Sequence, residues 1–341
     1  MAHTLKLNRE DYSAAESAMV RAASSCAGRP EPMLDTLAEL DAGSIPVPGR
    51  GDTLARFCLL ADLAAIDVAA ARTAEPHLDA LAILAESGCS ETPSGTWGVF
   101  AAEGPDGRLS AHLDGGSWTL SGEKPWCSLG TLLTDALVTA YTGEATRRLF
   151  RVSLRNDGVR SIDAPWVARG LAHIPSGPLE FDRVPAEPVG ADEWYTSRPG
   201  FQWGGIGVAA CWWGGAVPLA RLVIGSARRR DGDTAALAEA GRIFRLLEST
   251  RVFLENTAHR IDDGVDVQQT PVLAHAVRGA VADAVAEVLK AVDDVLGPAV
   301  LAFDEDIARR CADLQLYVMQ FRRGRENSSL GRRLDPDVSP W

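Results

Sequence analysis

The first ninety residues carry apolar side chains at helical spacing. From Tyr12 to Gly88 the chain is rich in alanine, and two short helices are expected before the Pro- and Gly-rich loop 44–52. An apolar stripe over 54–68, after a start at Asp52, predicts one helix. A second helix is predicted to open at Pro76 and end at Gly88. These stripes are expected to form a core.

Short runs suited to β-strands occupy the middle of the chain. They cover 97–102, 109–112, 118–120, 136–141, 149–154 and 179–181. Turn residues separate them, at 105–107, 114–116 and 156–158, and Gly122 is expected to mark a further turn. Regular short strands at this spacing predict a small antiparallel barrel or sandwich.

Helical spacing returns from Phe201 onward. The segment 205–229 is apolar nearly all round, which predicts a buried helix. Its glycines are expected to let a neighbour or ligand approach closely: Gly204, Gly205, Gly207, Gly214 and Gly215. Further apolar stripes follow at 243–254, 277–296 and 314–319. Four long helices with short links predict an antiparallel bundle.

The order of these patterns predicts an α+β protein with three domains. At 341 residues the chain is long enough for several cores. We expect an N-terminal helical domain (1–92), a middle antiparallel β-barrel or sandwich domain (93–196), a C-terminal four-helix bundle (197–331) and a loose tail (332–341).

Charge and composition exclude several classes of protein. The chain has 34 basic and 46 acidic residues, a net charge of −12, which argues against nucleic-acid binding. No apolar run reaches the ~18 residues of a membrane span, and residues 1–17 lack the features of a signal peptide. A cytoplasmic location is therefore expected. Arginines at 147, 148 and 151, or at 228–230, could meet a phosphate, although solvated surface arginines are the alternative.

Metal and nucleophile motifs are missing from the sequence. The six cysteines and six histidines are dispersed, without a Cys-x-x-Cys or His-x-x-x-His pair, so no metal site or disulfide scaffold is expected. There is no Gly-x-Ser-x-Gly and no phosphate-binding Gly-x-x-x-x-Gly-Lys. His77 is interpreted as a structural histidine.

The loop Lys124-Pro125-Trp126-Cys127-Ser128 is the sequence's main candidate for chemistry. In an extended segment, residues i and i+2 point the same way. Trp126 would then cover the face of a flat ring while Ser128 forms a hydrogen bond at its edge. Pro125 would stiffen the approach. The alternative is a buried Trp that anchors a hairpin.

Residues 118–140, "WTLSGEKPWCSLGTLLTDALVTA", resemble the middle-domain signature of the acyl-CoA dehydrogenase family. Segments 158–190 and 297–320 resemble later parts of the same family. The resemblance implies noncovalent FAD, with Trp126 packed against the flavin and Ser128 bonded near its reactive nitrogen. It also implies a homodimer or homotetramer that pairs through the C-terminal bundle.

The chain departs from the family at the first strand of the middle domain. Relatives carry Thr-Glu-Pro and a Gly-Ser-Asp turn there, whereas this chain reads Phe-Ala-Ala-Glu-Gly-Pro-Asp-Gly over 100–107. Ala102 stands at the Thr position, and the Gly-Ser-Asp element is missing. Backbone N–H groups around Phe100 and Ala102 are expected to contact the flavin without a side-chain donor.

The family's catalytic glutamate has no counterpart in the expected places. One place holds Gln202, Trp203, Gly204 and Gly205, and the other holds Gln320 or Phe321. Glu326 lies slightly beyond the second place and is a candidate substitute base, although an acid near a helix end can serve solubility or the helix dipole. The Arg-x-x-Phe-Gly segment that contacts FAD across subunits is also absent, because Asp-Gly-Asp-Thr follows Arg230.

Three functions follow from the resemblance. The first is an FAD-dependent oxidoreductase that oxidises the α,β-bond of an acyl substrate, including a CoA thioester, and passes electrons to an acceptor that the sequence does not name. The second is a flavin monooxygenase on the same fold, which needs no carboxylate base. The third is a non-catalytic relative.

Overall fold

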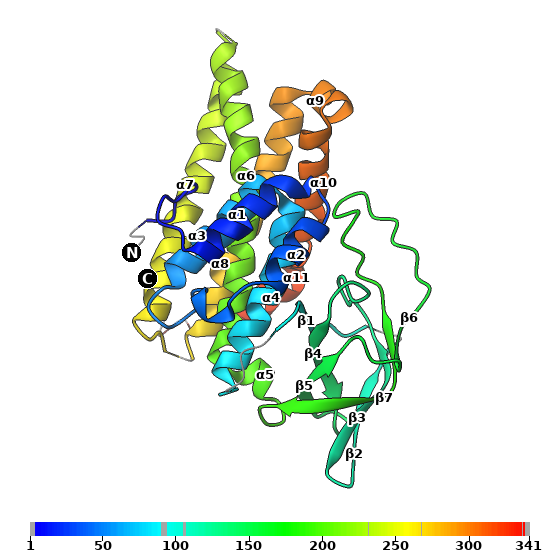
Figure 1. The fold of residues 1–341 in the computed structure, drawn as a ribbon. Coiled ribbons are helices and arrows are strands. Elements are labelled where there is room, and N and C mark those ends of the chain that lie inside the picture. The colour runs from blue at the N-terminus through cyan, green and yellow to red at the C-terminus, as the bar shows by residue number, and fades with distance from the viewer. Residues whose placement is uncertain are drawn as a thin grey trace.

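Helices from both ends of the chain pack together, and a domain of strands lies at one side of them (Figure 1). In this computed structural model the described residues are 4–89, 94–104, 107–230, 232–266, 268–335 and 337. The predicted turn at 105–107 and tail at 332–341 lie partly outside this range.

The N-terminal helices end in a long buried helix that passes beside the strand domain. They are α1 (Ala14–Cys26), α2 (Glu31–Ala38), the 3₁₀ turn η1 (Ala42–Ser44), α3 (Thr53–Ile66) and α4 (Val68–Glu86). The predicted start at Pro76 is wrong, because α4 begins eight residues earlier and contains Pro76. The Asp67 carboxylate caps it by accepting from the Ala70 amide at 2.9 Å. This cap and the burial of the first turn outweigh the proline's cost of about 3 kcal/mol.

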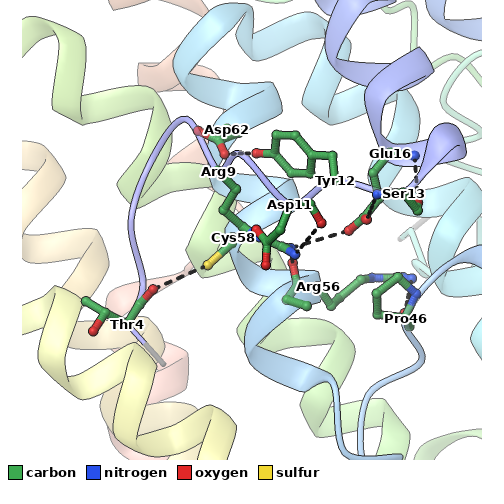
Figure 2. A network of polar contacts seen from close by, with 11 residues as sticks. Thr4, Arg9, Asp11, Tyr12, Ser13, Glu16, Pro46, Arg56, Cys58 and Asp62 are labelled. Atoms are coloured by element: carbon green, nitrogen blue, oxygen red, sulfur yellow. Dashed lines mark hydrogen bonds and ion pairs between the residues drawn. The ribbon is translucent and has the colours of Figure 1, made fainter. Parts of the chain in front are cut away.

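The segment before α1 is held against α3 by buried charges (Figure 2). The Arg9 guanidinium donates to the Ala55 carbonyl at 3.2 Å and pairs with Glu16, the capping-box acid of α1. The Tyr12 hydroxyl donates to the Asp62 carboxylate on α3. Burial raises the pKa of Asp62 to about 6. These contacts fix the N-terminal strap (residues 4–13) in the structure.

The strands form a closed barrel, as the sequence predicted. They are β1 (Trp97–Phe100), β2 (Leu109–Asp114), β3 (Ser117–Lys124), β4 (Asp135–Tyr141), β5 (Arg147–Ser153), β6 (Val159–Ser161) and β7 (Leu179–Val189). The order β1-β4-β2-β3-β7-β5 closes because β4 also pairs with β5. Two pairings, β1 with β4 and β2 with β4, are parallel rather than antiparallel.

Gly122 does not mark a turn, because β3 continues through it to Lys124. It forms an irregularity in the pairing with β7, at a φ of +117°. A Cβ there would lie 2.2 Å from the Arg108 carbonyl oxygen, so only glycine fits. The bulge carries β3 directly into the candidate loop.

The C-terminal part is a helical bundle around one apolar helix, as predicted. Its members are α5 (Trp194–Ser197), α6 (Pro199–Arg229), α7 (Thr234–Asp262), α8 (Thr270–Ala291), the π-helical turn η2 (Val292–Leu296), α9 (Pro298–Phe303), α10 (Glu305–Val318) and α11 (Arg323–Gly331). Helix α6 packs against α3, α7 and α8. The expectation that no apolar run reaches the length of a membrane span is wrong for α6, which is long and apolar enough by length and composition, and 83% of its apolar window is buried inside the protein.

The predicted close approach at the α6 glycines is confirmed. A Cβ on Gly214 would lie 2.1 Å from the Ala61 carbonyl oxygen of α3. A Cβ on Gly207 would lie 3.2 Å from the Leu60 side chain. Gly214 therefore lets α6 touch the backbone of α3, and Gly207 leaves room for the Leu60 side chain, so the two helical parts share one core.

Candidate functional site

The loop after β3 is anchored by a buried lysine. The Lys124 side chain is 1% exposed, and its ammonium group donates to Glu103 and Thr139, each at 2.9 Å. Burial lowers the pKa of Lys124, while the Glu103 carboxylate opposes that shift. A buried charge must be paired to be tolerated. Lys124 therefore fixes the point where the loop leaves the barrel.

Trp126 projects from this loop with its ring half open to solvent. Its side chain is 52% exposed. The expected extended backbone is wrong at this residue, because Trp126 has a φ of +60°. Leu129 in the same loop also has a positive φ, of +57°. Left-handed backbone at a bulky residue is costly, and such strain is common at ligand-binding positions. An exposed indole on a strained loop is free to stack on a planar ligand.

Ser128 connects the loop to helix α4. Its hydroxyl accepts a hydrogen bond from the Arg72 guanidinium at 2.7 Å and shares another with the Ser176 hydroxyl at 2.7 Å. Arg72 belongs to α4, so this contact joins the loop to the helices. The edge of the site next to Trp126 thus carries two hydroxyls and a guanidinium.

Helix α4 carries two carboxylates after Arg72, Glu75 one helical turn beyond it and Asp79 two turns beyond it. Burial, reinforced by the charge of Asp79, raises the pKa of Glu75 to about 7. Burial also raises the pKa of Asp79, and Arg198 opposes this shift from 3.8 Å. No described residue forms a hydrogen bond or ion pair with the Glu75 carboxylate. Glu75 is therefore a partly exposed acid without a partner.

The glycines at the start of α6 make room for charged side chains of other helices. A Cβ on Gly204 would lie 2.7 Å from the Asp79 carboxylate oxygen. A Cβ on Gly205 would lie 3.1 Å from the Arg278 guanidinium of α8, which donates to the Gly205 carbonyl. Asp79 thus projects toward the position that a side chain at 204 would occupy.

Four buried polar atoms near these charges have no nitrogen or oxygen partner among the described residues: Arg198 Nε, Trp203 Nε1, Trp212 Nε1 and the Tyr317 hydroxyl, which has the Cys211 thiol beside it. Trp212 on α6 and Tyr317 on α10 have side chains at most 1% exposed. Their rings meet edge to face with centroids 6.2 Å apart. The Arg278 guanidinium lies 5.0 Å from the Trp212 ring and that of Arg72 lies 5.8 Å from the Tyr317 ring. Orphaned buried donors at this depth call for a ligand or water.

The other residues predicted for the site differ in burial and in their distance from this cluster. Phe100 is 2% exposed inside the core, whereas Ala102 is exposed. Glu326 pairs with His275 at 2.9 Å and is close enough to Arg278 to affect its pKa. Phe321 is buried, and its ring lies against Gly279. Ala102 and the Phe100 backbone remain candidates, and Glu326 lies beside the cluster.

Helix α4 holds functional candidates that the sequence did not reveal. Arg72, Glu75 and Asp79 follow one another at spacings of three and four, so they share one face of α4. Three charges on one face of an alanine-rich buried helix are a signal in themselves. It was missed because a start at Pro76 places Arg72 and Glu75 outside the helix.

His77, on the neighbouring face of α4, is structural as predicted. Its side chain is 2% exposed, and its Nδ1 accepts from the Trp97 amide at 3.2 Å. Burial lowers the pKa of His77 to about 4. The neutral imidazole therefore ties α4 to β1 and takes no part in the cluster.

Four of the arginines considered for a phosphate contact other groups of the protein, and Arg228 and Arg229 are exposed. Arg147 lies 3.6 Å from Glu103, Arg148 donates to the Gly190 carbonyl at 2.9 Å, and Arg151 lies 3.9 Å from Glu187. In the second cluster, Arg230 donates to the Val295 carbonyl at 2.6 Å. These contacts favour the surface interpretation for both clusters.

The residues around the loop fit a flavin. The Trp126 ring offers a flat face, Ser128 and Ser176 offer hydroxyls, and Arg72 offers a cation beside them. An isoalloxazine ring needs a stacking surface and polar contacts at its edge. Both are present on one loop, which faces the helices through the Arg72–Ser128 bond.

Comparison with known proteins shows the fold. No protein-family model and no curated protein matches the chain. FMN-bound TdsC from Paenibacillus sp. A11-2 is 15% identical with a TM-score of 0.78, covering 94% of this chain and 96% of TdsC. KijD3 in complex with FMN and a dTDP-linked amino sugar is 16% identical with a TM-score of 0.77, and the match covers 99% of this chain and 98% of KijD3. A nitrososynthase from Micromonospora carbonacea var. africana is 18% identical with a TM-score of 0.77, and the match covers 98% of this chain and 100% of the nitrososynthase. The protein has the acyl-CoA dehydrogenase-like fold of these flavin-binding structures.

Proposed function

We propose that the protein is a flavin-dependent monooxygenase of the cytoplasm, built on the acyl-CoA dehydrogenase-like fold. The observation that carries this proposal is the state of the two places where the family holds its catalytic glutamate. At the first, Gly204 and Gly205 have no side chain and face Asp79 and Arg278. At the second, Phe321 is buried against Gly279. Oxygen activation by reduced flavin needs no base at either place. The shared fold of TdsC, a dibenzothiophene monooxygenase, supports the proposal.

The chain's own groups would bind and orient the flavin. Trp126 would stack on the ring, and Ser128 would hydrogen-bond at its edge while Arg72 holds the Ser128 hydroxyl. Lys124 would keep the loop in place through Glu103. Bound and reduced flavin supplies the electrons that activate oxygen. The barrel and helix α4 would exclude water from the reacting face.

FMN is the form of flavin that we propose, in place of the FAD that the sequence resemblance implies. The segment that contacts FAD across a subunit boundary in the family is missing after Arg230. TdsC and KijD3 hold FMN in the same fold. FMN lacks the adenosine part of FAD, so its binding does not require the segment that is missing here.

Flavin binding and oxygen uptake test the proposal. The purified protein is titrated with FMN and with FAD while tryptophan fluorescence and the visible spectrum are followed. The FMN-loaded protein is then reduced and mixed with oxygen, with and without candidate small molecules, and hydrogen peroxide is measured. We expect FMN to bind more tightly than FAD, and a substrate to lower the peroxide formed per oxygen consumed. A protein that takes up neither flavin would contradict the proposal and favour a non-catalytic relative.

A second candidate function is α,β-dehydrogenation of an acyl substrate, including a CoA thioester. It is favoured by the Asp79 carboxylate, which lies 2.7 Å from the Cβ position of Gly204. A carboxylate from α4 could replace the family's glutamate as the base for the α-proton. Anaerobic mixing with short and long acyl-CoA esters separates the two functions. We expect the flavin to stay oxidised, and rapid bleaching would favour the dehydrogenase.

A further inference from the structure

We propose that Glu75 is the proton-transfer residue of this site: its carboxylate exchanges a proton with an N–H or O–H group of the ligand held between α4 and the flavin loop (residues 124–134). This inference rests on the proposed flavin function for its setting. It adds a residue and a chemical requirement that the function alone does not supply.

The position of Glu75 is the first argument. It lies three residues after Arg72, so the two side chains are neighbours on one face of α4. Arg72 reaches the Ser128 hydroxyl at 2.7 Å on the loop that carries Trp126. A ligand that contacts the Ser128 hydroxyl would therefore lie beside Arg72, one helical turn from Glu75.

The missing partner of Glu75 is the second argument. The other acids of the cluster are engaged: Asp79 faces Arg198 at 3.8 Å and Glu326 faces His275 at 2.9 Å. Among the described residues, none forms a hydrogen bond or ion pair with Glu75, although its side chain is only partly exposed. A half-buried carboxylate kept without a partner is costly, so a role in binding or proton transfer accounts for it.

The buried hydroxyl of Tyr317 is a further observation at the same place. The Tyr317 side chain is 1% exposed, and its hydroxyl has the Cys211 thiol beside it, a weak hydrogen-bonding group, and no nitrogen or oxygen partner among the described residues. The Arg72 guanidinium, one helical turn from Glu75, lies 5.8 Å from the Tyr317 ring, and the Glu75 charge adds to the burial that raises the pKa of Tyr317. A buried donor beside an unpaired acid indicates a position for a polar ligand atom.

Burial and the groups around Glu75 bring its pKa close to neutral. The charged groups are Arg72 and Asp79 of α4, Arg56 of α3 and Arg278 of α8; Tyr195 of α5, Cys211 of α6 and Tyr317 of α10 are titratable neighbours that are uncharged near pH 7. Burial and Asp79 raise the pKa of Glu75 to about 7, against the three arginines. A carboxylate at this balance both accepts and donates protons near neutral pH.

The transfer itself is a simple proton exchange. The N–H or O–H bond of the ligand breaks as a proton bonds to a Glu75 carboxylate oxygen, and the electron pair stays on the ligand heteroatom. The protonated Glu75 later returns its proton to solvent or to the product. No oxidant enters this step, so it can be tested apart from oxygen chemistry.

Titration of Glu75 in the flavin-free protein is the direct test. Protein labelled with ¹³C at glutamate carboxyl carbons is titrated by NMR, and Glu75→Gln identifies the signal. We expect one glutamate to titrate near pH 7, to vanish in Glu75→Gln, and to move to lower pH in Asp79→Asn, which removes a neighbouring negative charge. Glu326→Gln, the matched acid on α11, should leave this signal in place. If the signal lost in Glu75→Gln titrates near pH 4.5, the proposal fails.

A second measurement uses the FMN-loaded protein without any substrate. The photoreduced protein is mixed with oxygen at pH 5.5 to 8.5, and the rate at which the flavin absorbance returns is followed. We expect an inflection near pH 7 in the natural protein, a flat profile in Glu75→Gln, and partial recovery of the inflection in Glu75→Asp. Equal FMN affinity and circular dichroism in all three would show that folding and the flavin site are intact. An unchanged inflection in Glu75→Gln would overturn the proposal. If the natural protein does not bind FMN, only the proposed flavin function is overturned, because the NMR titration still tests Glu75.

Discussion

At the scale of single residues, Trp126 combines an exposed aromatic ring with a strained backbone. Its ring is 52% exposed and its φ is +60°. Trp126→Ala removes a stacking surface from the proposed flavin site but little from the core. We expect FMN affinity to fall about tenfold, since an aromatic contact contributes about 0.5–1.5 kcal/mol beyond its buried area. Fluorescence titration measures the affinity.

The control for Trp126 is an equally exposed apolar residue away from the loop. Leu113 at the end of β2 is 57% exposed. Leu113→Ala should leave FMN affinity unchanged. Trp126→Ala should keep the unfolding temperature of the flavin-free protein within a few degrees. A loss of stability with unchanged affinity would show that Trp126 is part of the core.

Glu75 also makes stability depend on pH. Its pKa rises from 4.5 to about 7 in the folded protein, so the folded state binds this proton more tightly than the unfolded chain. Stability from this group is therefore fully present below about pH 4.5 and falls as pH rises to about 7. Glu75→Gln removes that loss, because glutamine does not ionise.

We expect Glu75→Gln to raise the free energy of unfolding at pH 8 by about 1–3 kcal/mol, since one pKa unit is worth about 1.4 kcal/mol. At pH 4.5 the two proteins should be equally stable. Urea unfolding at both pH values measures the difference. Glu180→Gln, at an exposed glutamate of β7, is the control. An equal change at both pH values would mean that ionisation of Glu75 is not its cause.

At the scale of elements, the contact between α3 and α6 depends on a missing side chain. A Cβ on Gly214 would lie 2.1 Å from the Ala61 carbonyl oxygen, which is backbone and cannot swing away. We expect Gly214→Ala to push the helices apart and to lower the free energy of unfolding by about 1–3 kcal/mol. Denaturant unfolding measures this loss.

Gly225 in the same helix provides a matched control. A Cβ there would meet only the flexible end of Arg229, at 3.3 Å. Gly225→Ala should be neutral or stabilising by up to about 1 kcal/mol, because alanine favours the helix. If both variants behave alike, the close contact at Gly214 has no energetic importance.

Element type could be predicted from the sequence because periodicity reports which face of a segment is buried. The barrel strands and bundle helices follow their apolar patterns, and β6 was missed because Val159–Ser161 is too short to show one. The start of α4 was missed because the Asp67 cap and tertiary burial outweigh the local effect of Pro76. Gly122 was misread because a bulge and a turn use the same residue.

The candidate site could be predicted only where it is local in sequence. Trp126 and Ser128 stand on one loop, as expected, and their contact with a flavin stays a prediction. The contact from Arg72 to Ser128 joins residues 56 positions apart, so no spacing reveals it. The same holds for Arg278, which reaches Gly205 across 73 positions. Such contacts arise from how α4, α6 and α8 pack around one another.

At the scale of the whole molecule, helix α7 carries an apolar stripe that the described chain leaves uncovered. Leu237, Phe244 and Val252 are 45%, 60% and 50% exposed, and spacings of seven and eight put them on one face. The sequence predicts a homo-oligomer through this bundle. A second copy of the same face would cover the stripe by a two-fold contact, the usual arrangement for soluble homo-oligomers.

We expect light scattering at micromolar concentration to give the mass of a dimer or tetramer. Phe244→Asp should shift it toward the monomer, because burying a phenylalanine contributes about 1.5–3 kcal/mol to each copy and a buried unpaired carboxylate opposes association. Leu113→Asp, equally exposed on the barrel, should leave the mass unchanged. A monomeric natural protein would refute the oligomer, and an unchanged mass in Phe244→Asp would place the interface elsewhere. Because Trp126 and Glu75 lie on the loop and on α4 rather than on α7, the dissociated variant should still bind FMN.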